Sequence, residues 1–145
     1  MKVAIIGAGS LGQSIAKGLL SNNAVSSLYL TKRNTNSIKG FSDYNKVTLT
    51  SDNEKAVKNA TILIFAVQPK HFELILNNLK SHLHENHVLI SVITGFSIAK
   101  IEAIVGSNTC IIRSMPNTAA AVGQSMTCLS PNKKGKEKVA LAKTI

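Results

Sequence analysis

A glycine-rich turn near the N-terminus constrains this chain more than any other feature of its sequence. Gly7, Gly9 and Gly12 form a G-x-G-x-x-G pattern between an apolar strand expected at 2–7 and an amphipathic helix expected at 11–20. There the glycines permit a tight turn, a close approach of pyrophosphate to the backbone and close packing of helix on strand. We therefore expect a dinucleotide phosphate at the helix N-terminus; a tight turn without a ligand is the alternative.

The rest of the chain alternates short apolar runs with amphipathic stretches, and this order predicts parallel strands joined by helices. We expect an α/β fold of the Rossmann type, doubly wound, with a mainly parallel sheet and helices on both faces. The 145 residues suffice for one domain. Further strands are expected at 27–31, 47–50, 61–67, 88–93, 110–114 and 126–129, and helices at 54–59, 69–83, 98–105 and 135–145, with a short or irregular helix between 32 and 46.

The end of the second expected strand carries cations where an NAD site would carry an acid. Thr31, Lys32, Arg33 and Asn34 stand there, and no acidic residue precedes Asp43. Asp or Glu would accept hydrogen bonds from the ribose 2′-hydroxyl of NAD, whereas Lys and Arg pair with the 2′-phosphate of NADP. The pattern favours NADP(H) over NAD(H), unless the two cations only solvate a loop.

The overall charge is strongly positive, with 17 Lys and Arg against 7 Asp and Glu. Nucleic acid is not the expected partner, because the chain has no Trp and only 4% aromatic residues for base stacking. No apolar run has the length of a membrane span. We expect a cytoplasmic protein that binds an anionic small molecule and not a membrane, with Cys110 and Cys128 as buried free thiols.

Several side chains have two interpretations. His82, His84 and His87 fall where the helix from Pro69 should end, so a solvated helix end is expected and a metal site is not. His71 either reaches the cofactor groove or is an ordinary surface histidine. Arg113 either meets an anionic ligand or forms a structural ion pair.

Four sequence blocks and their order resemble the pyrroline-5-carboxylate reductase family. They are Gly7 to Gly12, Thr31 to Asn34, Ala66 to Pro69 and Arg113 to Thr118; Gly95 and the run from Ser97 to Glu102 also match. Members of that family reduce a cyclic imine carboxylate to proline with NAD(P)H, so the resemblance implies an oxidoreductase of proline biosynthesis. Together with the strand-end cations, it implies cofactor contacts at Ile6, Gly7, Ala8, Gly9, Ser10, Leu11, Gly12, Thr31, Lys32, Arg33, Asn34, Asn53, Ala66, Val67, Gln68, Pro69, Val92, Ile93 and Thr94.

The resemblance also places Asn117 and Thr118 beside the reacting imine as catalytic residues. An uncharged amide and hydroxyl suit an iminium that loses its charge as hydride arrives, because a carboxylate there would stabilise the ground state more than the transition state. Capping of a helix after Pro116 is the alternative role for these side chains.

The chain departs from the family pattern in sequence and in length. Ile93 and Thr94 replace small alanines, Gln68 stands where the family often has Lys, and Ala119 where it often has Pro. Family members continue into a helical second domain that forms homo-oligomers and completes the substrate pocket; we expect residues 1–145 to be the cofactor domain alone. A non-catalytic dinucleotide-binding module and the cofactor domain of a β-hydroxyacid or ketopantoate-type dehydrogenase stay open as alternatives.

Overall fold

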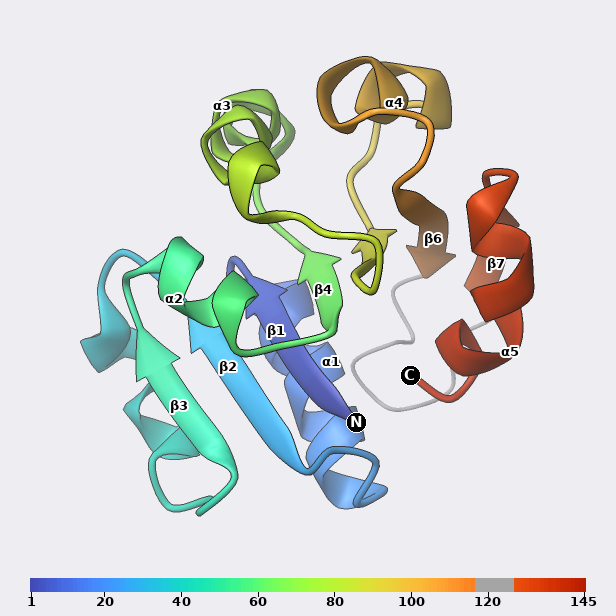
Figure 1. The fold of residues 1–145 in the computed structure, drawn as a ribbon. Coiled ribbons are helices and arrows are strands. Elements are labelled where there is room, and N and C mark those ends of the chain that lie inside the picture. Colours follow the sequence, from blue (N-terminus) through green and yellow to red (C-terminus); the bar gives the residue numbers. More distant parts are fainter. Residues whose placement is uncertain (117–126) are drawn as a thin grey trace.

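The apolar runs of the sequence form one seven-stranded sheet in the computed structural model, which describes residues 1–116 and 127–145 (Figure 1). The strand order is β3-β2-β1-β4-β5-β6-β7, and every neighbouring pair is parallel except β6 and β7. The strands are β1 (Lys2–Ile6), β2 (Ser27–Thr31), β3 (Val47–Thr50), β4 (Ile62–Phe65), β5 (Val88–Ser91), β6 (Cys110–Pro116) and β7 (Thr127–Pro131).

The direction in which strands are added reverses beside β1. The chain first builds outward through β2 to β3, then returns to place β4 on the other side of β1. Ile6 pairs with Thr31 of β2 and with Phe65 of β4, so the carboxyl ends of these three strands lie together at one edge. This order confirms the expected Rossmann-type fold, in which ligands bind in the crevice at such a reversal.

Helices cover both faces of the sheet, as expected. Short 3-10 turns, η1 (Thr35–Phe41), η2 (Lys80–His82) and η4 (Lys134–Lys138), supplement the α-helices. One buried cluster packs α1 (Ser10–Ser21), η1 (Thr35–Phe41) and α5 (Val139–Ala142) on one face, and a second packs α2 (Asn53–Lys58), α3 (Pro69–Leu79) and α4 (Ile98–Val105) on the other. None of the helices described is long and apolar enough to cross a bilayer.

Local sequence signals fix the start of several helices. Pro69 takes the first position of α3, where its missing N–H costs nothing. Asp52 caps α2 by accepting a hydrogen bond from the Lys55 N–H at 3.0 Å. The helix expected at 69–83 ends earlier, at Leu79, and continues as η2 (Lys80–His82).

The end of the described chain is anchored by a buried asparagine. The Asn132 amide nitrogen donates to a Glu102 carboxylate oxygen and to the Thr109 carbonyl, both at 2.9 Å. Its oxygen accepts from the backbone N–H groups of Ile111 and Gly135, at 3.1 and 2.7 Å. Asn132 therefore connects the turn after β7 to β6 and α4. After this turn come η4 (Lys134–Lys138) and α5, in place of the single helix expected at 135–145.

The two cysteines are free, as expected, but only one is buried. Cys110 lies in the core of β6, where burial raises the pKa of its thiol. Cys128 is exposed, so the expectation that both thiols are buried is wrong. The reason is that β7 pairs with β6 alone and forms an edge of the sheet.

The expected solvated helix end is wrong for one of its three histidines. His87 is only 1% exposed, and its Nδ1 accepts a hydrogen bond from the His84 N–H at 3.1 Å. That bond leaves the proton on Nε2, which lies 3.3 Å from the Val57 carbonyl and 3.1 Å from the Ala60 carbonyl. Burial, and secondarily the neighbouring His84, lowers the pKa of His87. No group of three metal-ligating side chains occurs among residues 1–116 and 127–145.

We predict that His87 makes folding sensitive to mild acid. The folded protein keeps the imidazole neutral, whereas the unfolded chain protonates it below its ordinary pKa of 6.5. Its contribution to the unfolding free energy is therefore complete above that pH and is lost progressively as the pH falls through the lowered pKa. In urea titrations, stability should fall more steeply for the natural chain than for His87→Gln, by at most about 1.4 kcal/mol per pH unit. Parallel curves would contradict this assignment.

Candidate nucleotide-binding site

The three glycines of the turn after β1 have three different surroundings. Gly7 has φ +98°, a left-handed conformation, and a Cβ there would lie 2.5 Å from a methyl of Val67. A Cβ at Gly12 would lie 2.5 Å from the Gly7 carbonyl oxygen, because α1 packs directly on the turn. At Gly9 a Cβ would meet nothing within 4 Å. The first and third glycines therefore build the turn, and the second leaves a space in front of it.

Thr31, the last residue of β2, joins this turn to the next strand. Its hydroxyl accepts a hydrogen bond from the Gly7 N–H at 3.1 Å, and its carbonyl accepts one from the Ala8 N–H at 2.7 Å. The residue is 2% exposed, so water does not compete for these bonds. The glycine turn and the basic segment that begins at Lys32 are consequently held in one fixed relation.

The N-terminus of α1 points at the same space with its donors free. Gly9 is the N-cap and offers no side chain to the helix. The first bond inside the helix runs from the Gln13 N–H to the Gly9 carbonyl at 2.9 Å. The N–H groups of the preceding first turn have no helical acceptor, and the dipole of this 12-residue helix adds partial positive charge there. This is an environment that favours a phosphate.

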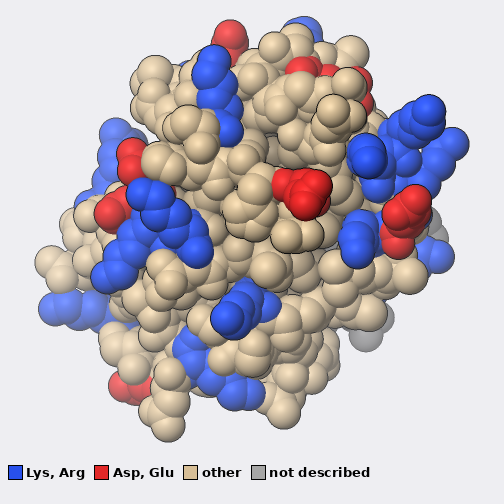
Figure 2. All heavy atoms as spheres, viewed as in Figure 1, with Lys and Arg blue, Asp and Glu red and all other residues tan. Residues whose placement is uncertain are grey.

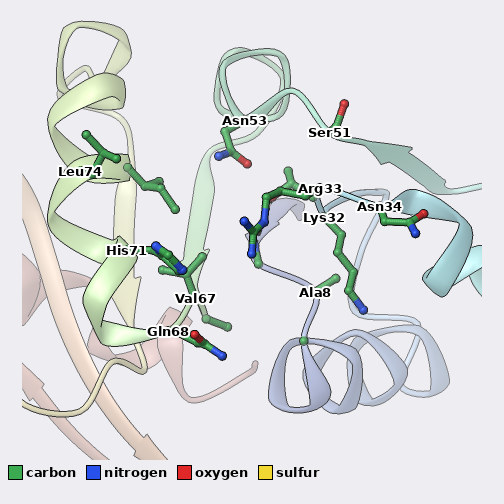
Figure 3. Close-up of a pocket in the computed structure, with 15 residues that line it drawn as sticks. Ala8, Lys32, Arg33, Asn34, Ser51, Asn53, Val67, Gln68, His71 and Leu74 are labelled. Carbon is green, nitrogen blue, oxygen red and sulfur yellow. Dashed lines mark hydrogen bonds between the residues drawn. The ribbon is translucent and has the colours of Figure 1, made fainter.

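A cavity of about 620 Å³ lies at the carboxyl ends of β1, β2 and β4, where the strand order reverses (Figure 3). Its volume is within the range typical of small-molecule and cofactor sites. Most of the expected cofactor residues meet in it: Gly7, Ala8, Gly9, Thr31, Lys32, Arg33, Asn34, Asn53, Ala66, Val67 and Gln68. Sequence blocks that lie far apart along the chain therefore line one cavity.

The two sides of the cavity differ in chemistry. The side formed after β2 and β3 is polar, with the Arg33 guanidinium extending into the space below the Asn53 amide in Figure 3. The two ion pairs of the described residues join Glu54 to Lys58 and to His82, so within those residues Lys32 and Arg33 have no acidic partner. The opposite side, on α3, presents Leu74, which is 65% exposed. The cavity therefore combines free positive charge with an apolar wall.

Four cavity residues were not among the expected contacts. Ser51 directly follows β3, so the position of that strand end in the sequence could have revealed it. His71 and Leu74 lie on α3 on the side away from Phe72, Leu76 and Leu79, which form its buried face, and Ile75 lies at the border, partly buried against the same core. Of the two interpretations of His71, the structure supports its place in the groove. The helical spacing indicated the core face but not that the opposite face borders a cavity.

Other expected residues lie outside the cavity lining. Ile6 and Ile93 are buried in the core, Pro69 begins α3, and Thr94 is exposed beyond β5. Val92 lines a second cavity of about 470 Å³ on the α1 side of the sheet. Ser10, Leu11 and Gly12 form the first turn of α1 and face a phosphate only through their backbone. Asn117 and Thr118 lie outside the described residues.

Arg113 of β6 has no acidic partner within the described parts of the chain. Its Nε is buried without a hydrogen bond, and Nη2 donates to the Met115 sulfur at 3.5 Å. A structural ion pair, one of its two expected roles, is therefore not found among those residues. Arg113 does not line the first cavity, so the structure does not connect it with the glycine turn.

Positive charge is spread over the face of the molecule that Figure 2 shows. Figure 2 shows Lys and Arg side chains distributed across the visible face, with few acidic side chains between them. A nucleic-acid surface concentrates basic groups on one face or along one helix. On this face the charge does not form such a single patch.

The strand order, the open turn at Gly9 and the adjoining basic cavity define a nucleotide-binding domain of the Rossmann type. Residues 2–95 match the family described as NADP oxidoreductase, coenzyme F420-dependent. The chain belongs to this family.

Three individual relatives of the chain belong to one group of reductases. The chain is 35% identical to pyrroline-5-carboxylate reductase 2 of Dictyostelium discoideum over 149 aligned positions, covering 97% of the chain and 50% of that protein. A pyrroline-5-carboxylate reductase structure from Coxiella burnetii superposes with a TM-score of 0.90 and 28% identity, covering 97% of this chain and 53% of the other. The Plasmodium falciparum pyrroline carboxylate reductase with NADP bound gives 0.83 and 28%, covering 99% and 53%. The chain thus spans about half the length of these relatives.

We predict opposite tolerance at two glycines of the turn. Gly12→Ala should lower the unfolding free energy by about 1–3 kcal/mol, because the new methyl collides with the Gly7 carbonyl and α1 must move away from the sheet. Gly9→Ala should change stability by less than about 1 kcal/mol, because its methyl points into open space. Urea unfolding of both variants measures this, with Gly18→Ala, also in open space on α1, as control. Equal losses at Gly9 and Gly12 would contradict the packing described.

Proposed function

We propose that this chain is the cofactor domain of an NADPH-dependent pyrroline-5-carboxylate reductase, and that a longer protein completes the active site. The observation that carries the proposal is the single cavity in which the glycine turn faces Lys32 and Arg33 without an opposing acid. The bound NADP of the Plasmodium relative and the reductases among the relatives support it. The approximately twofold length of those relatives supports a second half that forms the substrate pocket and joins subunits into a homo-oligomer.

The residues present fit a dinucleotide phosphate. The open space at Gly9 admits the pyrophosphate, and the free N–H groups at the start of α1 would hold it. Lys32 and Arg33 would bind the 2′-phosphate, Arg33 through two N–H groups at once, and Asn53 would contact the adjoining ribose from the start of α2. Ala66, Val67 and Gln68 would border the part of the cofactor that continues toward β5.

The chemistry divides between the cofactor and the protein. When bound, the reduced nicotinamide supplies the hydride that a cyclic imine carboxylate accepts. The protein has to hold the imine carbon against the nicotinamide, because positioning removes most of the entropic barrier. It also has to exclude water from the reacting groups. Asn117 and Thr118, which follow β6, are the proposed residues next to the imine. Their neutral side chains allow the iminium to lose its charge without losing a favourable ion pair.

We predict that the chain binds NADPH more tightly than NADH by at least tenfold, equivalent to about 1.5–3 kcal/mol for a charge-assisted contact to the 2′-phosphate. Arg33→Gln should raise the Kd for NADPH by about tenfold and leave that for NADH unchanged. Isothermal titration calorimetry at one salt concentration measures both.

Two variants control the selectivity experiment. Lys39→Gln removes an exposed cation outside the cavity and should change neither Kd. Gly9→Val should abolish binding of both nucleotides, because its side chain occupies the space in front of the turn. Equal affinity of the natural chain for NADPH and NADH would refute the preference, and binding to Gly9→Val as to the natural chain would place the ligand elsewhere.

We also predict a separation of binding from catalysis. Residues 1–145 should bind NADPH but reduce pyrroline-5-carboxylate very slowly. A chimera that joins them to the second half of the Dictyostelium relative should turn over faster by at least about a hundredfold, a modest part of what substrate positioning contributes in well-oriented systems. Oxidation of NADPH, followed by absorbance, reports both rates. Comparable rates for the two proteins would show that the pocket is complete without the second half.

A further inference from the structure

The segment between α3 and β5 holds α2 at both of its ends. At the start of α2, His82 Nε2 lies 3.1 Å from a carboxylate oxygen of Glu54. At the other end, the His87 Nε2–H is shared between the carbonyls of Val57 and Ala60. The Val57 carbonyl also accepts a hydrogen bond from the Ala60 N–H at 3.3 Å, so His87 adds a second donor there and joins the end of α2 to the segment before β5. We call His82 and His87 the histidine clamp.

The clamp matters because α2 is short and most of its residues are not buried. The helix has six residues, and only Ala56 and Val57 within it are buried. Two small side chains provide little apolar contact area, so polar contacts have a large share in fixing a helix of this length. His87 is held rigidly in turn, by the His84 N–H on Nδ1 and by the His84 ring stacked on it at 3.6 Å between centroids.

The opposite end of α2 enters the cavity. Asn53 is the first residue of the helix and Ser51 precedes it, and both line the proposed cofactor site. Figure 3 shows the Asn53 amide turned toward the Arg33 guanidinium on the same side of the cavity. Any shift of α2 along or away from the sheet therefore moves Asn53 relative to the cation that would bind the 2′-phosphate.

We propose that His87, assisted by His82, is a positioning residue for the ribose-phosphate end of the cofactor site, acting through α2 on Asn53. This inference rests on the proposed binding of NADPH. Within residues 1–116 and 127–145, His87 makes no hydrogen bond to a cavity residue; its effect on the ligand is transmitted through α2, which it holds from the side away from the cavity.

A double-mutant cycle tests the transmission. His87→Leu should raise the Kd for NADPH about fivefold in the natural chain and less than about twofold when Asn53→Ala is also present, because residues that act through a shared element are not additive. His87→Gln, whose amide can still donate to one carbonyl, should recover part of the affinity. Asn132→Ala is the matched control: it removes a buried hydrogen-bonding side chain far from α2 and should lower stability without changing the Kd.

The possible results are distinct. An unchanged Kd in folded His87→Leu, or the same factor in both backgrounds, would overturn the positioning role. Should His87→Leu fail to fold, His82→Gln replaces it, with an expected loss of about twofold in the natural chain that disappears with Asn53→Ala; equal Kd values there would overturn the proposal as well. A natural chain that does not bind NADPH would refute the proposed function itself and this inference with it.

Discussion

Two hydrogen bonds to Thr31 hold the site together. They connect the N–H groups of Gly7 and Ala8 to the hydroxyl and carbonyl of the last residue of β2. The glycine turn provides the opening that the proposed pyrophosphate would enter, and the segment from Lys32 provides the positive charge that would distinguish a 2′-phosphate. Because Thr31 is buried, the bonds are strong and directional. The sheet, and not a loop, therefore fixes the distance between the glycine turn and the cations.

The fold was largely predictable because each local signal agreed with the others. The glycine turn, the Asp52 cap and Pro69 at the start of α3 mark element boundaries through chemistry confined to a few residues. Alternation of apolar runs with helical periods then determined a parallel sheet. The antiparallel β7 was expected as a strand, but its place at the edge, and therefore the exposure of Cys128, depends on which strands become neighbours.

The site was less predictable where distant segments meet. In the polar half, Lys32 and Arg33 were expected from their position at a strand end, and Asn53 was expected from the family resemblance. Leu74 belongs to a helix face that borders a cavity only because α3 stands opposite β2. From the sequence, His87 was expected at a solvated helix end. It is buried because its segment packs on α2, where its ring contacts carbonyls about 30 positions earlier in the chain. Such contacts depend on tertiary packing and leave no period or motif in the sequence.

The crevice at the strand reversal divides the sheet into two parts, with β2 and β3 on one side and β4 to β7 on the other. Within the sheet, the pairing of β1 with β4 connects these parts. A nucleotide in the crevice would touch both parts. A ligand that binds only when the two parts are together stabilises that state against their separation. Occupancy of the crevice by the proposed nucleotide would therefore also protect the domain against proteases, because cleavage requires local opening.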